Sequence, residues 1–141
     1  MAASDENLLD VLNHQRARRG LPALAPSPAT GELAWYSGRL YRLVGRERCV
    51  EADFMSYEET GRPLPPTSDD RLGLSWAGVS TLLTLEAAAV RSRILRKEWC
   101  AILEIGADRP VLSVRGRRDH VDLYAAPDVL LSLVTEVLRC A

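Results

Sequence analysis

Two imidazoles are the side chains of this chain best suited by type to acid–base chemistry near neutral pH. His14 falls in the middle of a predicted helix, on its polar side, where we expect a solvated residue. His120 stands beside Asp119 and close to Asp122, which could form a metal site or an acid–base pair. The spacing implies no third ligand, so we interpret His120 as part of a charged turn at a strand edge.

The other groups that could do chemistry also lack a recognisable arrangement. The paired carboxylates Glu58-Glu59 and Asp69-Asp70 lie in a polar stretch, where we expect them to be solvated. The sequence holds no G-x-S-x-G, H-E-x-x-H, C-x-x-C or phosphate-binding glycine-rich loop. Three cysteines at wide spacings are predicted to be buried free thiols: Cys49, Cys100 and Cys140. We therefore expect no catalytic residue, no metal site and no cofactor, and predict that the chain is not an enzyme.

Arginine clusters raise the question of nucleic-acid binding. The first cluster lies near Tyr36 and Tyr41 and consists of Arg39, Arg42, Arg46 and Arg48. The second lies at a predicted turn and consists of Arg115, Arg117 and Arg118. Positive charge with stacking aromatics suits single-stranded nucleic acid. However, the formal net charge is −1 and neighbouring carboxylates balance the arginines. We expect solvent-facing sheet positions and no nucleic-acid partner.

Composition and length predict one globular domain over residues 1–141. Hydrophobic residues make up 47% of the chain and charged residues 26%, enough apolar surface for a core. No apolar run approaches the ~18 residues of a membrane span. The opening MAASDENLLDVL lacks the pattern of a signal peptide, so we expect a cytoplasmic protein.

Hydrophobic periodicity predicts the first half of the fold. Residues 5–19 form a predicted helix that Gly20 ends. Alternation then predicts three short strands in a meander, at 31–37, 39–45 and 49–55. Residues 57–69 read as a proline-rich loop.

The second half is predicted to start with a long helix over about 69–96, in which Gly73 and Gly78 are weak points. A hairpin of strands follows at 99–105 and 111–116, and 120–126 is either a third strand or a connector. A last helix starts at Pro127, with an apolar face of Leu130, Leu131, Val134, Val137 and Leu138. The predicted class is α+β, an antiparallel sheet with helices on one face, in the order α-βββ-α-ββ(β)-α.

This order of elements resembles the class I type III secretion chaperones. The resemblance rests on NLLDVL, on Gly20-Leu21-Pro22, on the stretch GELAWYSGRLYRLVGRERCVEADF, and on the closing VLSVRG and PDVLLSLVTEVL. It implies a dimer that holds an extended segment of a secreted effector or gatekeeper protein and keeps it competent for export. The mate would be an identical chain or a related small chaperone. The family's dimer helix falls on residues 72–95.

The resemblance also suggests which residues make contacts. The expected partner-binding residues, which would act through strand addition and apolar pockets, are Leu8, Leu12, Leu33, Trp35 and Leu40. The expected dimer contacts are Trp76, Val79, Leu83 and Val90. Whether Trp35 and Trp76 belong to an interface or to the core stays open at this point.

Two other resemblances are alternatives. Residues from about 30 to 141 resemble a roadblock-type domain, a scaffold or regulator of small GTPases, provided that 30–46 is helical. The stretches NHQRARRGLPAL and RSRILRKEWCAILEIG are similar to the cysteine-rich secretory/pathogenesis-related type of domain. That family carries His and Glu in a cleft, where Ser92 and Val79 stand here, so the chain would be a degenerate member.

Overall fold

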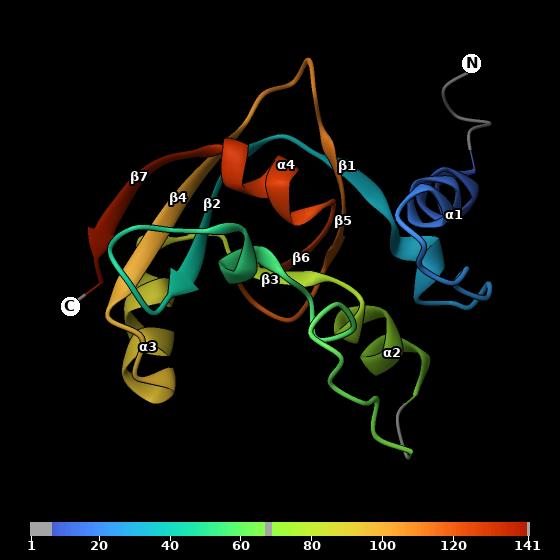
Figure 1. Cartoon of the computed structure of the whole chain (residues 1–141), viewed down its shortest axis with the longest axis horizontal. Coiled ribbons are helices and arrows are strands. Elements are labelled where there is room, and N and C mark those ends of the chain that lie inside the picture. Colours follow the sequence, from blue (N-terminus) through green and yellow to red (C-terminus); the bar gives the residue numbers. More distant parts are fainter. Residues whose placement is uncertain (1–6, 67–68, 141) are drawn as a thin grey trace.

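The computed structural model describes residues 7–66 and 69–140, which contain four α-helices and a seven-stranded antiparallel sheet (Figure 1). The strands follow the order β1-β5-β6-β3-β2-β4-β7. The predicted α+β class and antiparallel sheet are confirmed. The order of elements differs in several places from the order that the sequence predicted.

Helix α1 (Leu8–Arg18) begins and ends where local chemistry places its caps. The Asn7 side chain accepts hydrogen bonds from the N–H groups of Leu9 (3.0 Å) and Asp10 (3.3 Å). After the helix, Gly20 has φ of +75°, and the N–H of Leu21 returns to the carbonyl of Arg16 at 2.9 Å. The predicted glycine exit is confirmed.

The long helix predicted over 69–96 is wrong, because a strand divides this segment. Helix α2 (Asp70–Trp76) is short, strand β3 covers Val79–Leu82, and helix α3 covers Leu85–Leu95. A Cβ atom at Gly78 would lie 2.9 Å from Cζ of Tyr124. The backbone at Gly78 therefore lies too close to strand β6 (His120–Tyr124) for a residue with a side chain. Thr84 then caps α3 by accepting from the N–H of Ala87 at 3.1 Å.

Two further predictions are corrected in the same way. Residues 49–55 do not form a strand; they contain the 3₁₀ helix η3 (Glu51–Phe54). The last helix stops early, since α4 covers Pro127–Ser132 and the chain continues as strand β7 (Val134–Arg139), paired with β4 (Trp99–Ile105). The face of Leu130, Leu131, Val134, Val137 and Leu138 is therefore divided between a helix and a strand. Long-range pairing with β4 overrides its helical spacing.

The predicted meander is also wrong, because β1 (Ala34–Tyr36) and β2 (Gly38–Val44) do not pair with each other. Only Ser37 separates them. β1 pairs with β5 (Val111–Arg115), while β2 pairs with β4 and β3. Nor do β4 and β5 form the predicted hairpin; β5 pairs with β6 (His120–Tyr124). Gly38, with φ of +126°, sits at the junction of β1 and β2.

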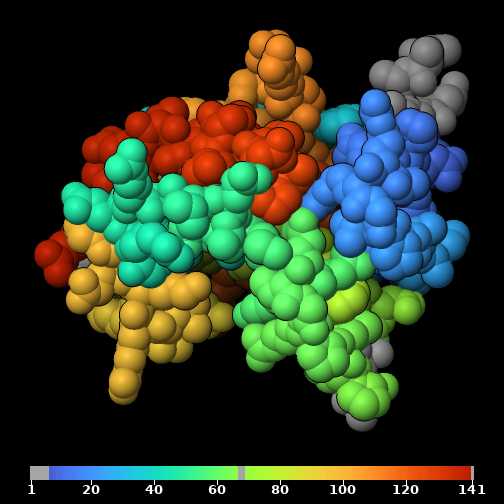
Figure 2. Space-filling model, in the orientation of Figure 1, coloured from blue at the N-terminus to red at the C-terminus, as the bar shows by residue number. Residues whose placement is uncertain are grey.

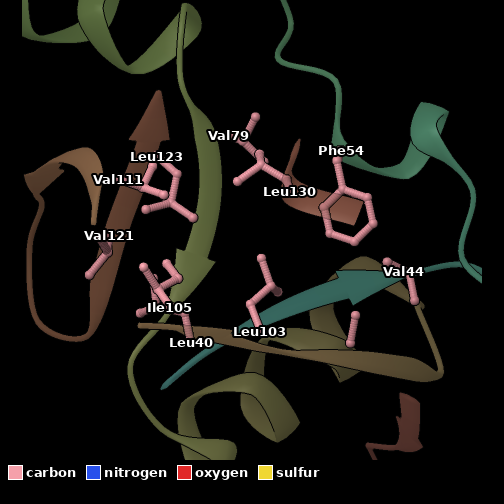
Figure 3. Packing of buried hydrophobic residues seen from close by; sticks show 11 residues of the cluster. Leu40, Val44, Phe54, Val79, Leu103, Ile105, Val111, Val121, Leu123 and Leu130 are labelled. Carbon is pink, nitrogen blue, oxygen red and sulfur yellow. The ribbon is translucent and has the colours of Figure 1, made fainter. Parts of the chain in front are cut away.

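These pairings curl the sheet into a ring. The strand path β1-β5-β6-β3-β2 starts and ends on one continuous segment, so its two ends are joined through Ser37. Side chains on the inner face of the ring point toward one another (Figure 3), and the cluster comprises Leu40, Val44, Phe54, Val79, Ala101, Leu103, Ile105, Val111, Val121, Leu123 and Leu130. Phe54 of η3 and Leu130 of α4 complete this cluster from outside the sheet.

The outer face of the sheet carries the other three helices. Leu12 of α1 and Leu74 of α2 pack with Val114 and Tyr124 over β5 and β6. On β2 and β4, Ala88 of α3 forms a separate small cluster with outward-facing side chains and Cys140. Helices therefore contact both faces of the sheet, α4 the inner face and α1, α2 and α3 the outer face, where the sequence placed them on one.

A buried ion pair joins α1 to the proline-rich loop. The Arg16 guanidinium contacts both carboxylate oxygens of Glu58, and Arg19 pairs with Glu59. The prediction that Glu58 and Glu59 are merely solvated is therefore wrong. This loop is tied to the helix by side chains that lie 42 positions apart in sequence.

Candidate binding groove

The residues predicted to bind a partner do not share a surface. Leu40 is fully buried inside the ring, and Leu12 and Leu33 are buried in the cluster beneath α1 and α2. Leu8 is half-buried against that same cluster. Trp35 is the one of the five that is largely exposed, at 41%. In this conformation Leu12, Leu33 and Leu40 serve the core rather than an interface.

The residues predicted to form a dimer contact are scattered as well. Val79 lies in the ring interior, and Leu83 packs against the same cluster. Trp76 is half-buried, and its indole N–H donates to the carbonyl of Arg62 at 2.7 Å. Val90 alone is strongly exposed, at 55%. The helix on which these four would have lined up is interrupted by β3.

Val90 belongs to a groove that sequence reasoning missed. The groove lies between α2 and α3 on the outer face of the sheet, has a volume of about 1020 Å³, and has Val114 and Tyr124 among its lining residues. Its exposed apolar side chains are Leu72 (49% exposed) from α2, and Val90 and Ile94 (63%) from α3. In Figure 2 the gold atoms of α3 and the green segment that precedes α2 stand apart at the lower edge of the molecule, and no described residue of that green segment lines the groove. The i, i+4 pair of Val90 and Ile94 was the available signal, but the sequence prediction placed Val90 among the dimer contacts of one long helix.

Arginines surround this groove and give it an excess of positive charge. Arg71 pairs with Glu32. The other four lining arginines have no ion pair with any described residue: Arg91, Arg115, Arg117 and Arg118. Four described carboxylates also line the groove, so the positive excess is one charge: Glu32 pairs with Arg71, Asp69 accepts from the Leu72 N–H at 2.8 Å, Asp122 contacts His120, and Asp119 is the fourth. The arginines without an ion pair could therefore attract an acidic ligand.

His120 lies in the wall of the groove, in contact with a serine and a carboxylate. Its Nε2 atom is 2.8 Å from Oδ1 of Asp122 and 3.2 Å from Oγ of Ser80. In a Ser-His-Asp triad the carboxylate and the serine bond opposite ring nitrogens, so that one orients the ring while the other is activated. Here both contact the same nitrogen. The arrangement orients the imidazole but does not relay a proton from Ser80.

Burial disfavours the thiolate form of all three cysteines. The thiols are free, with Cys100 and Cys140 buried and Cys49 half-buried, as the sequence predicted except for the partial exposure of Cys49. Burial raises the pKa of Cys100 to about 12, far from the thiolate form that nucleophiles and metal ligands need. Burial also raises the pKa of Tyr124, whose hydroxyl donates to the carbonyl of Leu74 at 2.8 Å.

Within the described residues, no group of three or more His, Cys, Asp or Glu side chains is placed to hold a metal ion. No helix there is long and apolar enough to cross a membrane.

Comparison with known proteins gives no match: no protein-family model, curated protein or solved structure matches this chain. Any functional assignment must rest on the geometry of the groove and on the residues around it.

Proposed function

We propose that this chain is a non-catalytic binding protein that holds a segment of a partner polypeptide in the groove between α2 and α3. The observation that carries the proposal is the exposure of Leu72, Val90 and Ile94 beneath arginines that have no carboxylate partner in the described residues. The partner segment would present apolar side chains to the bed of the groove and carboxylates to its rim.

The energetics of such a complex follow from burial and charge. Complete burial of a Leu, Ile or Val side chain contributes about 1.5–3 kcal/mol, so side chains that are half exposed now could each add roughly 1 kcal/mol. Arginines on the rim would mainly raise the association rate and select acidic partners over basic ones. A helix or an extended segment with alternating apolar and acidic residues satisfies both requirements.

Addition of a partner strand to the sheet edge is less well supported as the binding mode. β7 lies at one end of the strand order and exposes Glu136 and Arg139. Charged side chains on an edge strand discourage pairing with another chain. The groove has no such protection, and its apolar side chains face solvent.

A secretion chaperone is the specific form of this activity that the sequence resemblance suggests. Such a protein would hold its effector or gatekeeper in the cytoplasm without chemistry, as a dimer with an identical or related chain. The groove would replace the expected contact surface of Leu8, Leu12, Leu33, Trp35 and Leu40, since three of these are buried.

No specific observation favours the alternatives. A roadblock-type domain needs a helix over 30–46, where the chain forms β1 and β2. In the cysteine-rich secretory type of domain, Ser92 and Val79 would stand in a cleft. Here the Ser92 hydroxyl donates to the carbonyl of Lys97, and Val79 is buried.

A matched pair of variants tests the proposal. Val90→Asp places a charge in the groove, and Val129→Asp places the same charge on the exposed face of α4, where Val129 is 44% exposed and does not line the groove. Peptides selected from a random display library should be rich in apolar and acidic residues. Measured by fluorescence anisotropy, their affinity should fall about tenfold or more with Val90→Asp and stay unchanged with Val129→Asp. Equal losses in the two variants, or selected peptides without acidic residues, would contradict the proposal.

A further inference from the structure

A second cavity adjoins the groove. It has a volume of about 280 Å³ and draws its lining from β2, β3, the C-terminal part of α3 and the segment around Met55 to Tyr57. Four residues line both cavities: Ser75, Leu82, Arg91 and His120. The smaller cavity, which we call the side pocket, is therefore next to the groove but has its own set of polar groups.

The side pocket is lined by cations and hydroxyls but by no carboxylate. Arg42, Arg91 and Lys97 contribute positive charge, and no Asp or Glu is among its lining residues. Two carboxylates outside the lining, Asp53 and Asp122, favour the charged form of Arg42, although less than burial opposes it, and each also contacts another group. Asp53 accepts from the Val50 N–H at 2.8 Å, and Asp122 contacts His120. The positive charge in the pocket is thus not neutralised by its own walls.

Arg42 is held in place by neutral acceptors. Its Nε atom donates to the carbonyl of Asp53 at 3.0 Å, and its Nη1 atom donates to the carbonyl of Ser80 at 2.8 Å. Neither bond supplies a countercharge. Burial lowers the pKa of Arg42. The pKa of Lys97 is also lowered, mainly by burial and to a smaller extent by the charge of Arg42. Arg42 and Lys97 line one small cavity, and the charge of Arg42 disfavours the charge of Lys97, so an incoming anion would favour the charged amine.

We propose that the side pocket binds a phosphate group, carried either by a small metabolite or by a phosphorylated side chain of a bound partner segment. A phosphate monoester carries close to two negative charges and three acceptor oxygens, which suits several converging cations better than a single carboxylate does. Tyr57 and Ser80, which both carry hydroxyl groups, also line the pocket, and the Ser80 hydroxyl lies 3.2 Å from Nε2 of His120. The volume accommodates a phosphate with a small attached group and is below the range of drug-sized ligands, about 300–1,000 Å³.

Lys97 offers a clean test because it is the only lysine of the chain. Its backbone N–H and carbonyl bond to Ser92, whereas none of the hydrogen bonds or ion pairs of the described residues involves its side-chain amine. Lys97→Gln should therefore fold normally. Arg93→Gln is the matched control, since Arg93 lies in the last turn of α3, four positions before Lys97, lines neither cavity and loses the same charge.

The experiment is a titration of the ¹⁵N-labelled chain with inorganic phosphate, with glycerol phosphate and with acetate, followed by NMR. We expect saturable shifts at the amides of Ser80 and Lys97 with both phosphates, and weaker binding of acetate. Lys97→Gln should weaken phosphate binding about tenfold or more, and Arg93→Gln should leave it within about twofold. Absence of saturable shifts, acetate binding as tight as phosphate, or equal losses in both variants would overturn the proposal.

A phosphoserine peptide and its unphosphorylated form distinguish the two sources of phosphate. Tighter binding of the phosphopeptide than of glycerol phosphate assigns the pocket to a partner side chain, and equal binding assigns it to a small metabolite. The pocket does not depend on the groove's function. Val90→Asp should leave the affinity for inorganic phosphate unchanged, and Lys97→Gln should leave the affinity for unphosphorylated peptides unchanged, so each proposal can fail separately.

Discussion

Arg16 and Glu58 form a two-pronged ion pair inside the protein, with Nη1–Oε1 and Nη2–Oε2 distances of 2.8 and 2.6 Å. Only 2% of the Arg16 side chain and 7% of the Glu58 side chain are exposed. The Nε atom of Arg16 donates to the carbonyl of Pro22 at 2.8 Å, so one guanidinium connects α1, the segment after it and the proline-rich loop. A charge so well enclosed depends on its partner, because neither group can return to water while the chain stays folded.

Glu58→Gln should therefore destabilise the protein by about 3–5 kcal/mol, since it leaves a buried guanidinium without its countercharge. Urea unfolding measured by circular dichroism gives this difference. Glu59→Gln is the control: its partner Arg19 is 26% exposed, and we expect a loss of about 1 kcal/mol or less. Replacing both Arg16 and Glu58 by Met should cost far less than the single change. A single Glu58→Gln variant as stable as the double variant would show that the pair does not carry this role.

Gly78 and Gly73 should respond to alanine in opposite directions. Gly78→Ala places a methyl group 2.9 Å from Cζ of Tyr124 and 3.0 Å from Cβ of Asp122, and such overpacking costs about 1–3 kcal/mol. Gly73→Ala lies within α2 and meets only Leu64 Cδ2 at 3.8 Å, an ordinary contact, so helix propensity should stabilise it by up to about 1 kcal/mol. Thermal unfolding of the two variants gives both signs. A stabilising Gly78→Ala would contradict the close approach of β3 to β6.

The sequence predicted the elements whose patterns are local. The strands predicted at 99–105 and 111–116 are confirmed as β4 and β5, and Gly20 correctly marked the exit of α1. Errors arose where distant contacts decide. Ser37-Gly38 has the composition of a turn but joins two strands that run on without reversing, because each pairs with a different distant partner.

The C-terminal strand illustrates the same limit. Residues 134–139 carry apolar side chains at helical spacing, yet they pair with β4 as strand β7. Their two β-branched valines tolerate either state, and only the position of β4 selects the strand. The groove could not be predicted either, since it depends on the break between α2 and α3. Strand β3 divides the predicted long helix, so Val90, a predicted dimer contact, and Ile94 lie on the separate helix α3 and are exposed beside the groove.

Leu40 belongs to the contact surface predicted from the sequence, and Leu72 belongs to the groove that we propose as the binding site. Leu40 is fully buried in the ring, so Leu40→Ala should lower the free energy of unfolding by about 2–5 kcal/mol. Leu72 is 49% exposed in the groove, so Leu72→Ala should cost less than about 1 kcal/mol and instead weaken binding of selected peptides. Urea unfolding and peptide anisotropy on both variants check this. A Leu40→Ala variant that folds with unchanged stability would return Leu40 to the partner surface.

Lys97 should make the protein less stable near neutral pH than a neutral residue would. Burial and the charge of Arg42 lower the amine's pKa, and Asp53 raises it to a smaller extent. An amine with a lower pKa in the folded state binds fewer protons there than in the unfolded chain, at every pH between the two values. Stability therefore rises with pH across that window, which ends near the ordinary lysine value of 10.5.

Lys97→Gln removes that penalty, so at pH 7 the variant should be more stable than the wild type by a few tenths of a kcal/mol. The difference should shrink as the pH approaches 10.5, because the wild-type amine then loses its charge in both states. Urea unfolding at pH 7 and pH 10 measures it, with Arg93→Gln as the control that should show no such trend. Added phosphate should stabilise the wild type at pH 7 and have less effect on Lys97→Gln, since a ligand stabilises only the state that binds it. A variant less stable than the wild type at pH 7 would contradict this prediction, because it would mean that the charged Lys97 amine stabilises the folded state.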